Sequence, residues 1–321
     1  MVKSAILLHI MLRHYTKHSP GEEFRQVHTP HTEGVWTHAE RPTDEELEIV
    51  EKSHNLDPNI VNDLRDNEEL PRVEYSGDTL YVFLRCAQRS KHGEVITAPL
   101  LAAATTDAFI TLTSTNSVAE SKIVSALHQD ARSEDKGALL LSTFTAVIVD
   151  YQVLINRTGK YIKDIGHRLR THEVNNADFV HFVTIEDNLN EYTLNLTGMR
   201  AVAERLRENK HDTFTAKDCE ALDDLVLFIS QLISIVSSHG QSVTSIRNAY
   251  STIANNNLNR RMKTLTVLTV LITLPNVFFG MYGMNVALPF DNEPWAYAAI
   301  VLFTLGLILS VYLLAKRFKV F

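Results

Sequence analysis

The pattern of hydrophobic and polar residues divides the chain into a polar body and a very apolar C-terminal tail. No Asp, Glu, Lys or Arg lies between Lys263 and Asp291, and none lies between Glu293 and Lys316. Each uncharged run exceeds the roughly 20 residues that a helix needs to cross about 30 Å of hydrocarbon. The tail therefore predicts two transmembrane helices joined by a short external loop. The first helix, the loop and the second helix are expected at about 263–283, 285–294 and 295–315.

The first part of the polar body, residues 1–116, has the pattern of a mixed α/β domain. Continuous or alternating apolar stretches predict strands at Ala5–Leu12, Thr79–Arg85, Ile96–Ala104 and Phe109–Leu112. Thr43 precedes an acidic turn and can cap a helix. A second short helix is expected from Asp57 to Leu64, because Pro58 suits the first position of a helix.

Long helical periodicity replaces this pattern from about residue 117, and no proline follows until Pro275. Helices are expected at Ala138–Arg170 and Phe179–Glu208, within a helical cytoplasmic segment of residues 117–216. A last helix is expected over residues 217–284, where a stalk of the body continues into the first membrane span. At 1.5 Å per residue it would be on the order of 100 Å long. A soluble helix of this length needs partners, which a parallel bundle of several subunits would supply.

The charges around the two spans predict their orientation. Basic residues precede the first span and follow the second, at Arg260, Arg261, Lys263, Lys316, Arg317 and Lys319. The loop between the spans has no Lys or Arg and carries Asp291 and Glu293. The positive-inside rule then places both termini, including the basic tail 316–321, in the cytoplasm. We expect a multi-pass protein of the cell (inner) membrane, in contact with its lipid.

The first span carries a polar stripe on one helical face. Its members follow one another at spacings of three and four residues: Thr266, Thr269, Thr273, Asn276, Gly280 and Gly283. Such small residues often mediate helix packing in lipid, which remains an alternative. Asn276 favours a wet environment, because an amide is costly in hydrocarbon. Around a ring of subunits the stripe would line a narrow pore, with Leu265 tightening its cytoplasmic end.

The chemistry of such a pore favours a hard cation. Neutral oxygen acceptors suit an ion that keeps its water shell, as Mg²⁺ does. Asp291 and Glu293 at the external mouth would concentrate cations.

Composition excludes several other classes of function. The net charge is −7 and no basic stripe with interleaved aromatic residues appears, so no nucleic acid partner is expected. No GxxxxGK[ST] motif occurs, so no nucleotide is expected. Cys86 and Cys219 lie far apart and form neither a CxxC motif nor a disulfide framework. Without a nucleophile and its base, the chain is not expected to be an enzyme, and no organic cofactor is implied.

The segment Tyr282-Gly283-Met284-Asn285 resembles the GMN signature of the CorA family of magnesium channels. The resemblance extends to the neighbouring and upstream segments Met262–Thr266, Leu274-Pro275, Trp295, Pro71–Tyr75 and Leu80–Leu84. It implies an α+β cytoplasmic domain, a long stalk helix and two C-terminal transmembrane helices in a funnel-shaped homopentamer. The implied ion is Mg²⁺, with Co²⁺ and Ni²⁺ as further candidates.

The resemblance also implies roles for single residues. Asn285 would face the hydrated ion in the external ring, Gly283 would permit close approach, and Tyr282 and Met284 would brace the loop. Met262 and Leu265 match the hydrophobic constriction, and Asn259 matches the polar ring beneath it. Asn276 would form a second polar ring. It stands where family members often have Thr, so the chemical character of this second ring stays open.

A regulatory Mg²⁺ site between subunits is a further implication of the resemblance. Asp63 matches one ligand position, and Asp224, with its neighbour Asp223, matches the facing position on the stalk. Paired carboxylates repel each other unless a cation lies between them, so losing internal Mg²⁺ would loosen the ring and open the pore. The alternative is that these residues are solvated surface acids.

The expected function is passive Mg²⁺ uptake, because a divalent cation gains about 4.6 kcal/mol per 100 mV of inside-negative potential. A Zn²⁺ transporter of the same superfamily with proton coupling remains an alternative, since imidazole prefers borderline metals. This alternative rests on six histidines near the N-terminus, namely His9, His14, His18, His28, His31 and His38. The competing interpretation is that they are surface residues of the N-terminal domain. A membrane-anchored sensor or scaffold is a more distant alternative, because an anchor needs no polar stripe.

Overall fold

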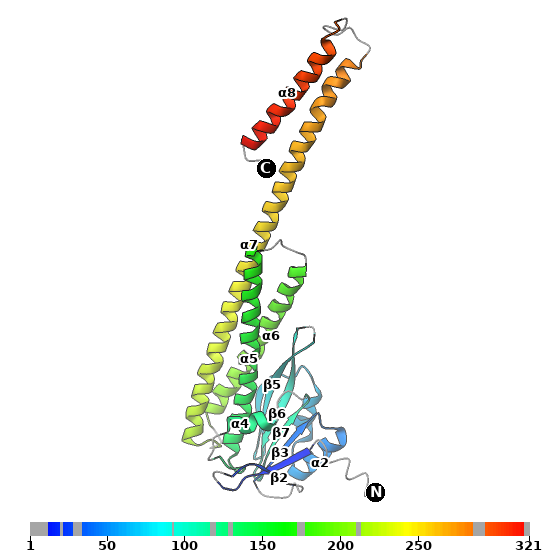
Figure 1. Cartoon of the computed structure of the whole chain (residues 1–321). Coiled ribbons are helices and arrows are strands. Elements are labelled where there is room, and N and C mark those ends of the chain that lie inside the picture. Colours follow the sequence, from blue (N-terminus) through cyan, green and yellow to red (C-terminus); the bar gives the residue numbers. More distant parts are fainter. Residues whose placement is uncertain are drawn as a thin grey trace. The chain divides into compact units, whose positions relative to one another are not determined.

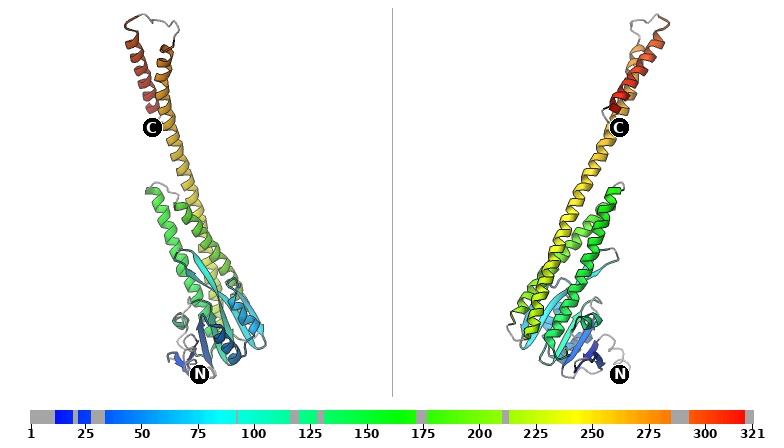
Figure 2. Two further views of the ribbon diagram at one scale, coloured as in Figure 1. Left: turned by 90° about the vertical axis from the view of Figure 1, so that its right-hand side faces the viewer. Right: turned by 60° about the vertical axis from the view of Figure 1, so that its left-hand side comes forward.

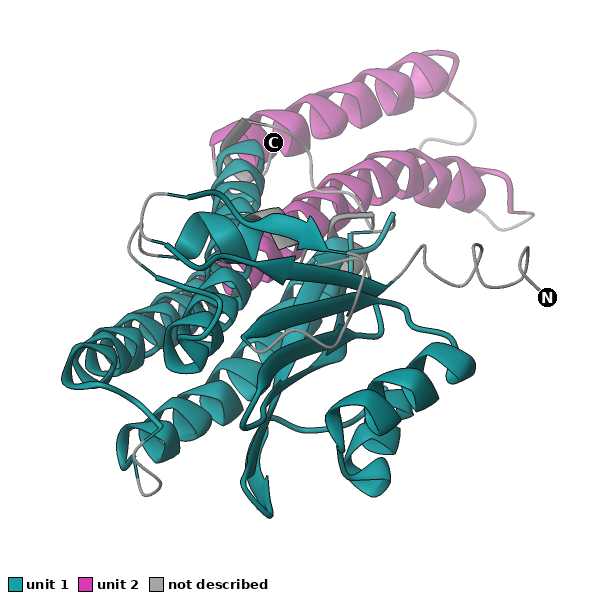
Figure 3. Ribbon diagram, turned by 90° about the horizontal axis from the view of Figure 1, so that it is seen from below, with its two compact units in different colours: residues 1–244 teal, residues 245–321 magenta. Residues whose placement is uncertain are grey.

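The computed structural model describes residues 12–19, 22–27, 34–91, 93–115, 120–127, 131–171, 177–209, 213–284 and 293–317. The chain divides into two compact units, Met1–Thr244 and Ser245–Phe321 (Figure 3). The division falls inside one long helix, so unit 1 contains the first part of that helix and unit 2 contains the rest.

A seven-stranded sheet forms the centre of unit 1 (Figure 1). Its strands are β1 (Leu12–Thr16), β2 (Arg25–Val27), β3 (Val35–Glu40), β4 (Arg72–Ser76), β5 (Thr79–Arg89), β6 (Val95–Ala104) and β7 (Ala108–Thr113). They are ordered β2-β1-β3-β7-β6-β5-β4, with β3 parallel to β7 and every other neighbouring pair antiparallel. The predicted strands at 79–85, 96–104 and 109–112 are confirmed. Of the strand predicted at 5–12, residues 5–11 lie outside the described residues, and β1 begins at Leu12.

Helices cover both faces of this sheet, so its central strands are buried on both sides. Every residue of β5 from Thr79 to Ala87 is buried. On one face, Tyr81 and Phe83 join a hydrophobic core with α2 (Asp44–His54), α3 (Pro58–Asn62) and the short 3-10 helix η1 (Asp63–Arg65). On the other face, α5 (Lys136–Thr171) lies against β5, β6 and β7, and α6 (Ala177–Arg207) lies against β4 and β5.

Local sequence signals begin and end the short helices. The Thr43 side chain accepts a hydrogen bond from the Glu46 amide, and the Glu46 carboxylate accepts one from the Thr43 amide. Asn55 ends α2 in the left-handed conformation, with φ at 50°. Pro58 begins α3, as expected, and Asp57 caps it. The helix predicted at 57–64 is therefore present, although its second half is the 3-10 turn η1.

The three long helices that begin in unit 1 agree with the periodicity of the sequence to within two residues at each end. They are α5, α6 and α7 (Ala216–Tyr282), which follow the short helix α4 (Glu120–Ala126). Within unit 1, α5 and the first part of α7 lie side by side (Figures 1 and 2). Gly159 on α5 allows this approach, since a Cβ there would lie 2.5 Å from Nε2 of His239 on α7.

Unit 2 consists of the last part of α7 and of α8 (Ala296–Arg317). The two helices contact each other through the rings of Phe278 and Phe303, whose centroids are 5.4 Å apart. Both are long and apolar enough to cross a membrane, and so is α5. The most apolar window of α5, however, is 61% buried in this chain, against 0% for α7 and 11% for α8. Because the apolar surface of α5 is used by the core of unit 1, only α7 and α8 correspond to the predicted membrane spans.

Candidate functional site

The polar stripe of the first span occupies a face of α7 that α8 leaves open. Thr266, Thr269, Thr273, Asn276 and Gly280 are all exposed in the single chain, and so are Asn259, Met262 and Leu265. A different row of α7 is partly covered: Val267, Leu271, Leu274 and Phe278. This row contains the ring that contacts α8 and lies roughly opposite the stripe, at about 100° per residue. Contact with the second span of the same chain therefore does not explain the small and polar residues.

The threonine hydroxyls of the stripe all have the same orientation. Each donates to the carbonyl four residues earlier: Thr266 to Met262 at 2.9 Å, Thr269 to Leu265 at 2.9 Å, and Thr273 to Thr269 at 2.7 Å. Because the hydroxyl proton is used inside the helix, the oxygen presents only its lone pairs outward. The exposed face consequently offers hydrogen-bond acceptors, which suit a cation and its bound water.

The helix ends where the GMN signature begins. The Gly283 amide donates to the Phe279 carbonyl at 3.0 Å, and the Met284 amide donates to the Met281 carbonyl at 3.3 Å. The side chains of Tyr282 and Met284 are 38% and 60% exposed. Asn285 and Asp291 lie outside the described residues, whereas Glu293 is exposed just before α8.

Asp63 is part of an ion-pair cluster centred on Arg72. One Asp63 carboxylate oxygen accepts a hydrogen bond from Arg72 at 2.7 Å, and Arg72 also pairs with Glu69 and Glu74. The guanidinium group of Arg72 lies 4.3 Å from the centre of the Phe83 ring. The Asp63 side chain is still 43% exposed, so it is accessible to a further ligand.

The two acids predicted on the stalk have different surroundings. Asp223 pairs with Arg207 at 2.9 Å, and its neighbour Asp224 is exposed on α7. Among the described residues of this single chain, no group of three or more His, Cys, Asp or Glu side chains could hold a metal ion.

Three of the six N-terminal histidines lie within the described residues, whereas His9, His28 and His31 lie outside them. His14 and His38 are buried in the sheet, where their Nδ1 atoms lie 3.0 Å from the Thr37 hydroxyl and 2.7 Å from the Thr111 hydroxyl. The expectation that the histidines are surface residues is thus wrong for these two, because they form hydrogen bonds between strands. His18 is exposed, and its ring lies 3.9 Å from Glu134.

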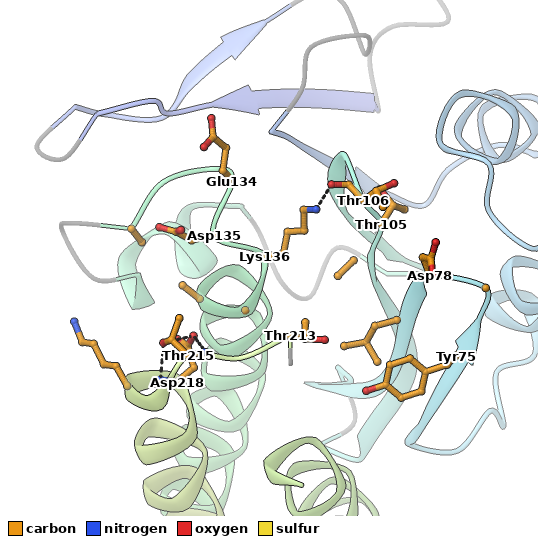
Figure 4. Close-up of a pocket in the computed structure, with 17 residues that line it drawn as sticks. Tyr75, Asp78, Thr105, Thr106, Glu134, Asp135, Lys136, Thr213, Thr215 and Asp218 are labelled. Atoms are coloured by element: carbon orange, nitrogen blue, oxygen red, sulfur yellow. Dashed lines mark hydrogen bonds between the residues drawn. The ribbon is translucent and has the colours of Figure 1, made fainter. Parts of the chain in front are cut away.

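A cavity of about 660 Å³ in unit 1 lies beside the first turns of α5 and α7 (Figure 4). Some of its charged lining residues have partners in the chain. Lys136 donates to the Thr106 carbonyl, and Asp218 accepts from the Thr215 hydroxyl at 2.7 Å. Burial lowers the pKa of Lys136, although the nearby Asp107 opposes this effect. Nothing in the sequence pattern indicated this cavity, and its mixed charges point to no single ligand.

Three comparisons with known proteins show which family and which fold this chain is similar to. The family described as CorA-like Mg²⁺ transporter protein matches residues 32–317. A curated relative, the cobalt/magnesium transport protein CorA of Methanocaldococcus jannaschii, is 24% identical over 306 residues, covering 88% of this chain and 90% of the relative.

Solved structures also resemble the fold, and two of them are informative here. The complete structure of the CorA magnesium transporter of the same organism has a TM-score of 0.83 at 19% identity, and the match covers 96% of this chain and 98% of the other. The cytoplasmic domain of ZntB from Vibrio parahaemolyticus has a TM-score of 0.59 at 16% identity, covering 77% of this chain and 98% of the other. The predicted order of an α+β domain, a long helix and a C-terminal helix is therefore confirmed. Because the family match extends over nearly the whole sequence, this chain belongs to the family of CorA-like Mg²⁺ transporter proteins.

Proposed function

We propose that the protein is a passive Mg²⁺ uptake channel in which five copies of the chain place the polar face of α7 around one pore. The observation that carries this proposal is the exposed stripe on the side of α7 away from α8. Two membrane spans cannot enclose a pathway alone, whereas a ring of subunits can. In such a ring α8 would be the outer helix and would contact lipid.

The character of the stripe favours a hydrated divalent cation. Each ring of threonine oxygens would accept hydrogen bonds from water molecules bound to the ion, since the hydroxyl protons are used within the helix. Mg²⁺ dehydrates reluctantly and usually keeps several waters, so contacts through its water shell suit it. Met262 and Leu265 are 54% and 56% exposed on the adjoining turns, where they would form an apolar constriction.

The external end of the pore would select the ion. Asn285, which follows the described end of α7, would present its side-chain oxygen to hydrated Mg²⁺, and Glu293 and Asp291 would raise the local cation concentration. Basic residues before the first span and after the second support a cytoplasmic location of unit 1. An inside-negative potential of 100 mV would then favour accumulation by about 4.6 kcal/mol, or roughly 2,000-fold.

Internal Mg²⁺ would regulate the channel through Asp63 of one subunit and Asp224, with Asp223 beside it, of the next. A cation between these carboxylates removes their mutual repulsion and holds neighbouring subunits together. Because Asp63 already pairs with Arg72, Mg²⁺ would compete with that guanidinium group for one carboxylate oxygen. Closure at high internal Mg²⁺ would then be a shift between two states of the ring.

Zn²⁺ transport with proton coupling is the second candidate, because the fold of the ZntB cytoplasmic domain matches 77% of this chain. A membrane-anchored scaffold is a weaker alternative. Co²⁺ and Ni²⁺ uptake would accompany Mg²⁺ uptake if selection depends on the hydrated ion.

The test of the pore face is a pair of threonine substitutions in protein reconstituted into liposomes. Thr273→Val keeps the shape of the side chain and removes the acceptor, so we expect Mg²⁺ uptake to fall about tenfold as one hydrogen-bonding ring is lost. Thr264→Val is the matched control. Thr264 makes the same bond to the carbonyl four residues earlier, at 3.1 Å, but lies roughly opposite the stripe.

Equal uptake by the two threonine variants would contradict the assignment of the pore face. Asn285→Ala tests the external ring separately, and it should abolish selective Mg²⁺ uptake while the oligomer stays intact. Normal selective uptake by that variant would remove Asn285 from the proposed ring.

A further inference from the structure

A second cavity, of about 180 Å³, lies in unit 1 between α5, α6 and the end of the β5–β6 hairpin. The hairpin contributes Arg89, α5 contributes Arg157 and Thr158, and α6 contributes His181 and Tyr192. None of the residues that line this cavity is acidic, although the chain as a whole has a net charge of −7. The cavity is thus a locally basic site on an acidic protein.

The amide side chain of Asn188 connects two of the elements around this cavity. The Asn188 side chain on α6 accepts a hydrogen bond from the Val95 amide at 2.7 Å and donates one to the Gly93 carbonyl at 3.0 Å. Both partners belong to the hairpin, so Asn188 fixes the hairpin end against α6. Arg89 is the last residue of β5, just before that turn, and lines the cavity.

The inner wall of the cavity is polar. Tyr192 is buried, and its hydroxyl lies 3.3 Å from the hydroxyl of Thr158. Burial raises the pKa of Tyr192, whereas the Thr158 hydrogen bond and the positive charges of Arg89 and Arg157 oppose this rise. Both guanidinium groups therefore act on the same phenol, although they come from different elements.

The two arginines have no competing partner in the described part of the chain. Neither Arg89 nor Arg157 forms an ion pair with a described residue, and both are exposed at the rim. Arg72 and Arg207, in contrast, bind carboxylates of the same chain. The guanidinium donors of the cavity are consequently available to a ligand.

We propose that this cavity is a binding site for a phosphate group, either of inorganic phosphate or of a small phosphate ester. A guanidinium group can donate two parallel hydrogen bonds to a phosphate, and two such groups line this cavity. Thr158 and Tyr192 add hydroxyl groups on the inner side. A bound phosphate would connect α5, α6 and the hairpin, independently of any ion in the membrane pore.

Calorimetric titration of the full chain in detergent with inorganic phosphate, at constant ionic strength and pH 7.5, tests the site. We expect saturable binding, and Arg89→Gln and Arg157→Gln should each weaken it about tenfold, as for the loss of one charge-assisted hydrogen-bond pair. Arg132→Gln is the matched control, because Arg132 is also exposed in unit 1 but does not line the cavity. The affinity of that variant should equal that of the unmodified chain.

Absence of saturable binding, or unchanged affinity in Arg157→Gln, would overturn the proposal. Arg157→Lys covers the case in which the Gln variant does not fold, since it keeps the charge and should bind more weakly than Arg. The source of the phosphate group is distinguished by titrating glycerol phosphate and dioctanoyl phosphatidic acid in parallel. Similar affinities for all three compounds indicate a soluble ligand, whereas tighter binding of the phosphatidic acid than of inorganic phosphate indicates a lipid headgroup.

Discussion

If the protein is the proposed Mg²⁺ channel, replacement of Arg72 by Gln should make its closure more sensitive to internal Mg²⁺. In the structure the Arg72 guanidinium donates to Asp63 at 2.7 Å and also neutralises Glu69 and Glu74. The change releases the Asp63 carboxylate without removing it. If Asp63 is a regulatory ligand, the cation then binds without first displacing the guanidinium group.

The size of the effect follows from the exposure of the pair. The Asp63 and Arg72 side chains are 43% and 30% exposed, so their interaction is that of a partly solvated ion pair. Such pairs contribute about 0.5–1 kcal/mol, which corresponds to a roughly two- to fivefold gain in Mg²⁺ affinity. Without Arg72, the negative charges of Glu69 and Glu74 also increase the affinity for Mg²⁺. Loss of the contact between Arg72 and the Phe83 ring lowers stability as well, by about 0.5–1 kcal/mol.

The assay is uptake into liposomes loaded with increasing internal Mg²⁺, and the quantity measured is the concentration that halves the uptake rate. We expect this concentration to fall about two- to fivefold in Arg72→Gln. Arg65→Gln is the matched control, because Arg65 pairs with Asp44 at 2.6 Å on neighbouring elements and touches no proposed ligand. An unchanged or higher half-inhibiting concentration in Arg72→Gln would refute the role of Asp63.

Three further outcomes are expected. Asp63→Ala combined with Asp224→Ala should abolish protection by Mg²⁺ in limited proteolysis, and protection equal to that of the unmodified chain would count against both ligands. Gly159→Ala should lower the free energy of unfolding by about 1–3 kcal/mol through its contact with His239, whereas Gly240→Ala, with open space around it, should be neutral or stabilising. Burial and the nearby Lys163 lower the pKa of His239 from 6.5, so the unfolded chain binds this proton more readily. The contribution of neutral His239 to stability is then fully present above pH 6.5 and is lost as the pH falls toward the folded pKa. In thermal melts, the melting temperature of the unmodified chain should therefore fall more on acidification than that of His239→Gln.

The helical part of the fold could be predicted from the sequence because its signals are long and local. The periodicity of α5, α6 and α7 extends over many turns, and their observed ends differ by at most two residues from the expected ones. The family was also identified correctly from the GMN segment and its flanks. Since the family is one of transporters, the expectation that the chain is not an enzyme is confirmed as well.

Strand β3 was missed because its buried side chains include polar ones. Thr37 and His38 are fully buried, although polar residues of these types suggest an exposed segment when only the sequence is considered. The neighbouring strand explains them, since the Thr111 hydroxyl accepts a hydrogen bond from Trp36 at 3.0 Å and lies 2.7 Å from the His38 ring. Such pairing joins residues more than 70 positions apart and leaves no local pattern.

The candidate site was only partly predictable for a similar reason. Spacing alone indicated the stripe on α7, because one helix carries all its members. The orientation of the hydroxyls and the position of the α8 contact follow only from the three-dimensional structure. Neither the Arg72 pairing of Asp63 nor the convergence of Arg89 and Arg157 follows from spacing, since each brings together different elements.

The most direct test of the central claim is uptake by the purified full chain in liposomes under an imposed inside-negative potential. Mg²⁺, Co²⁺, Ni²⁺ and Zn²⁺ are compared with and without a proton gradient. We predict Mg²⁺ uptake that depends on the potential alone and persists when the proton gradient is removed. Zn²⁺ uptake that collapses with the proton gradient, without Mg²⁺ uptake, would contradict a magnesium channel and assign the chain to the zinc-transporting alternative.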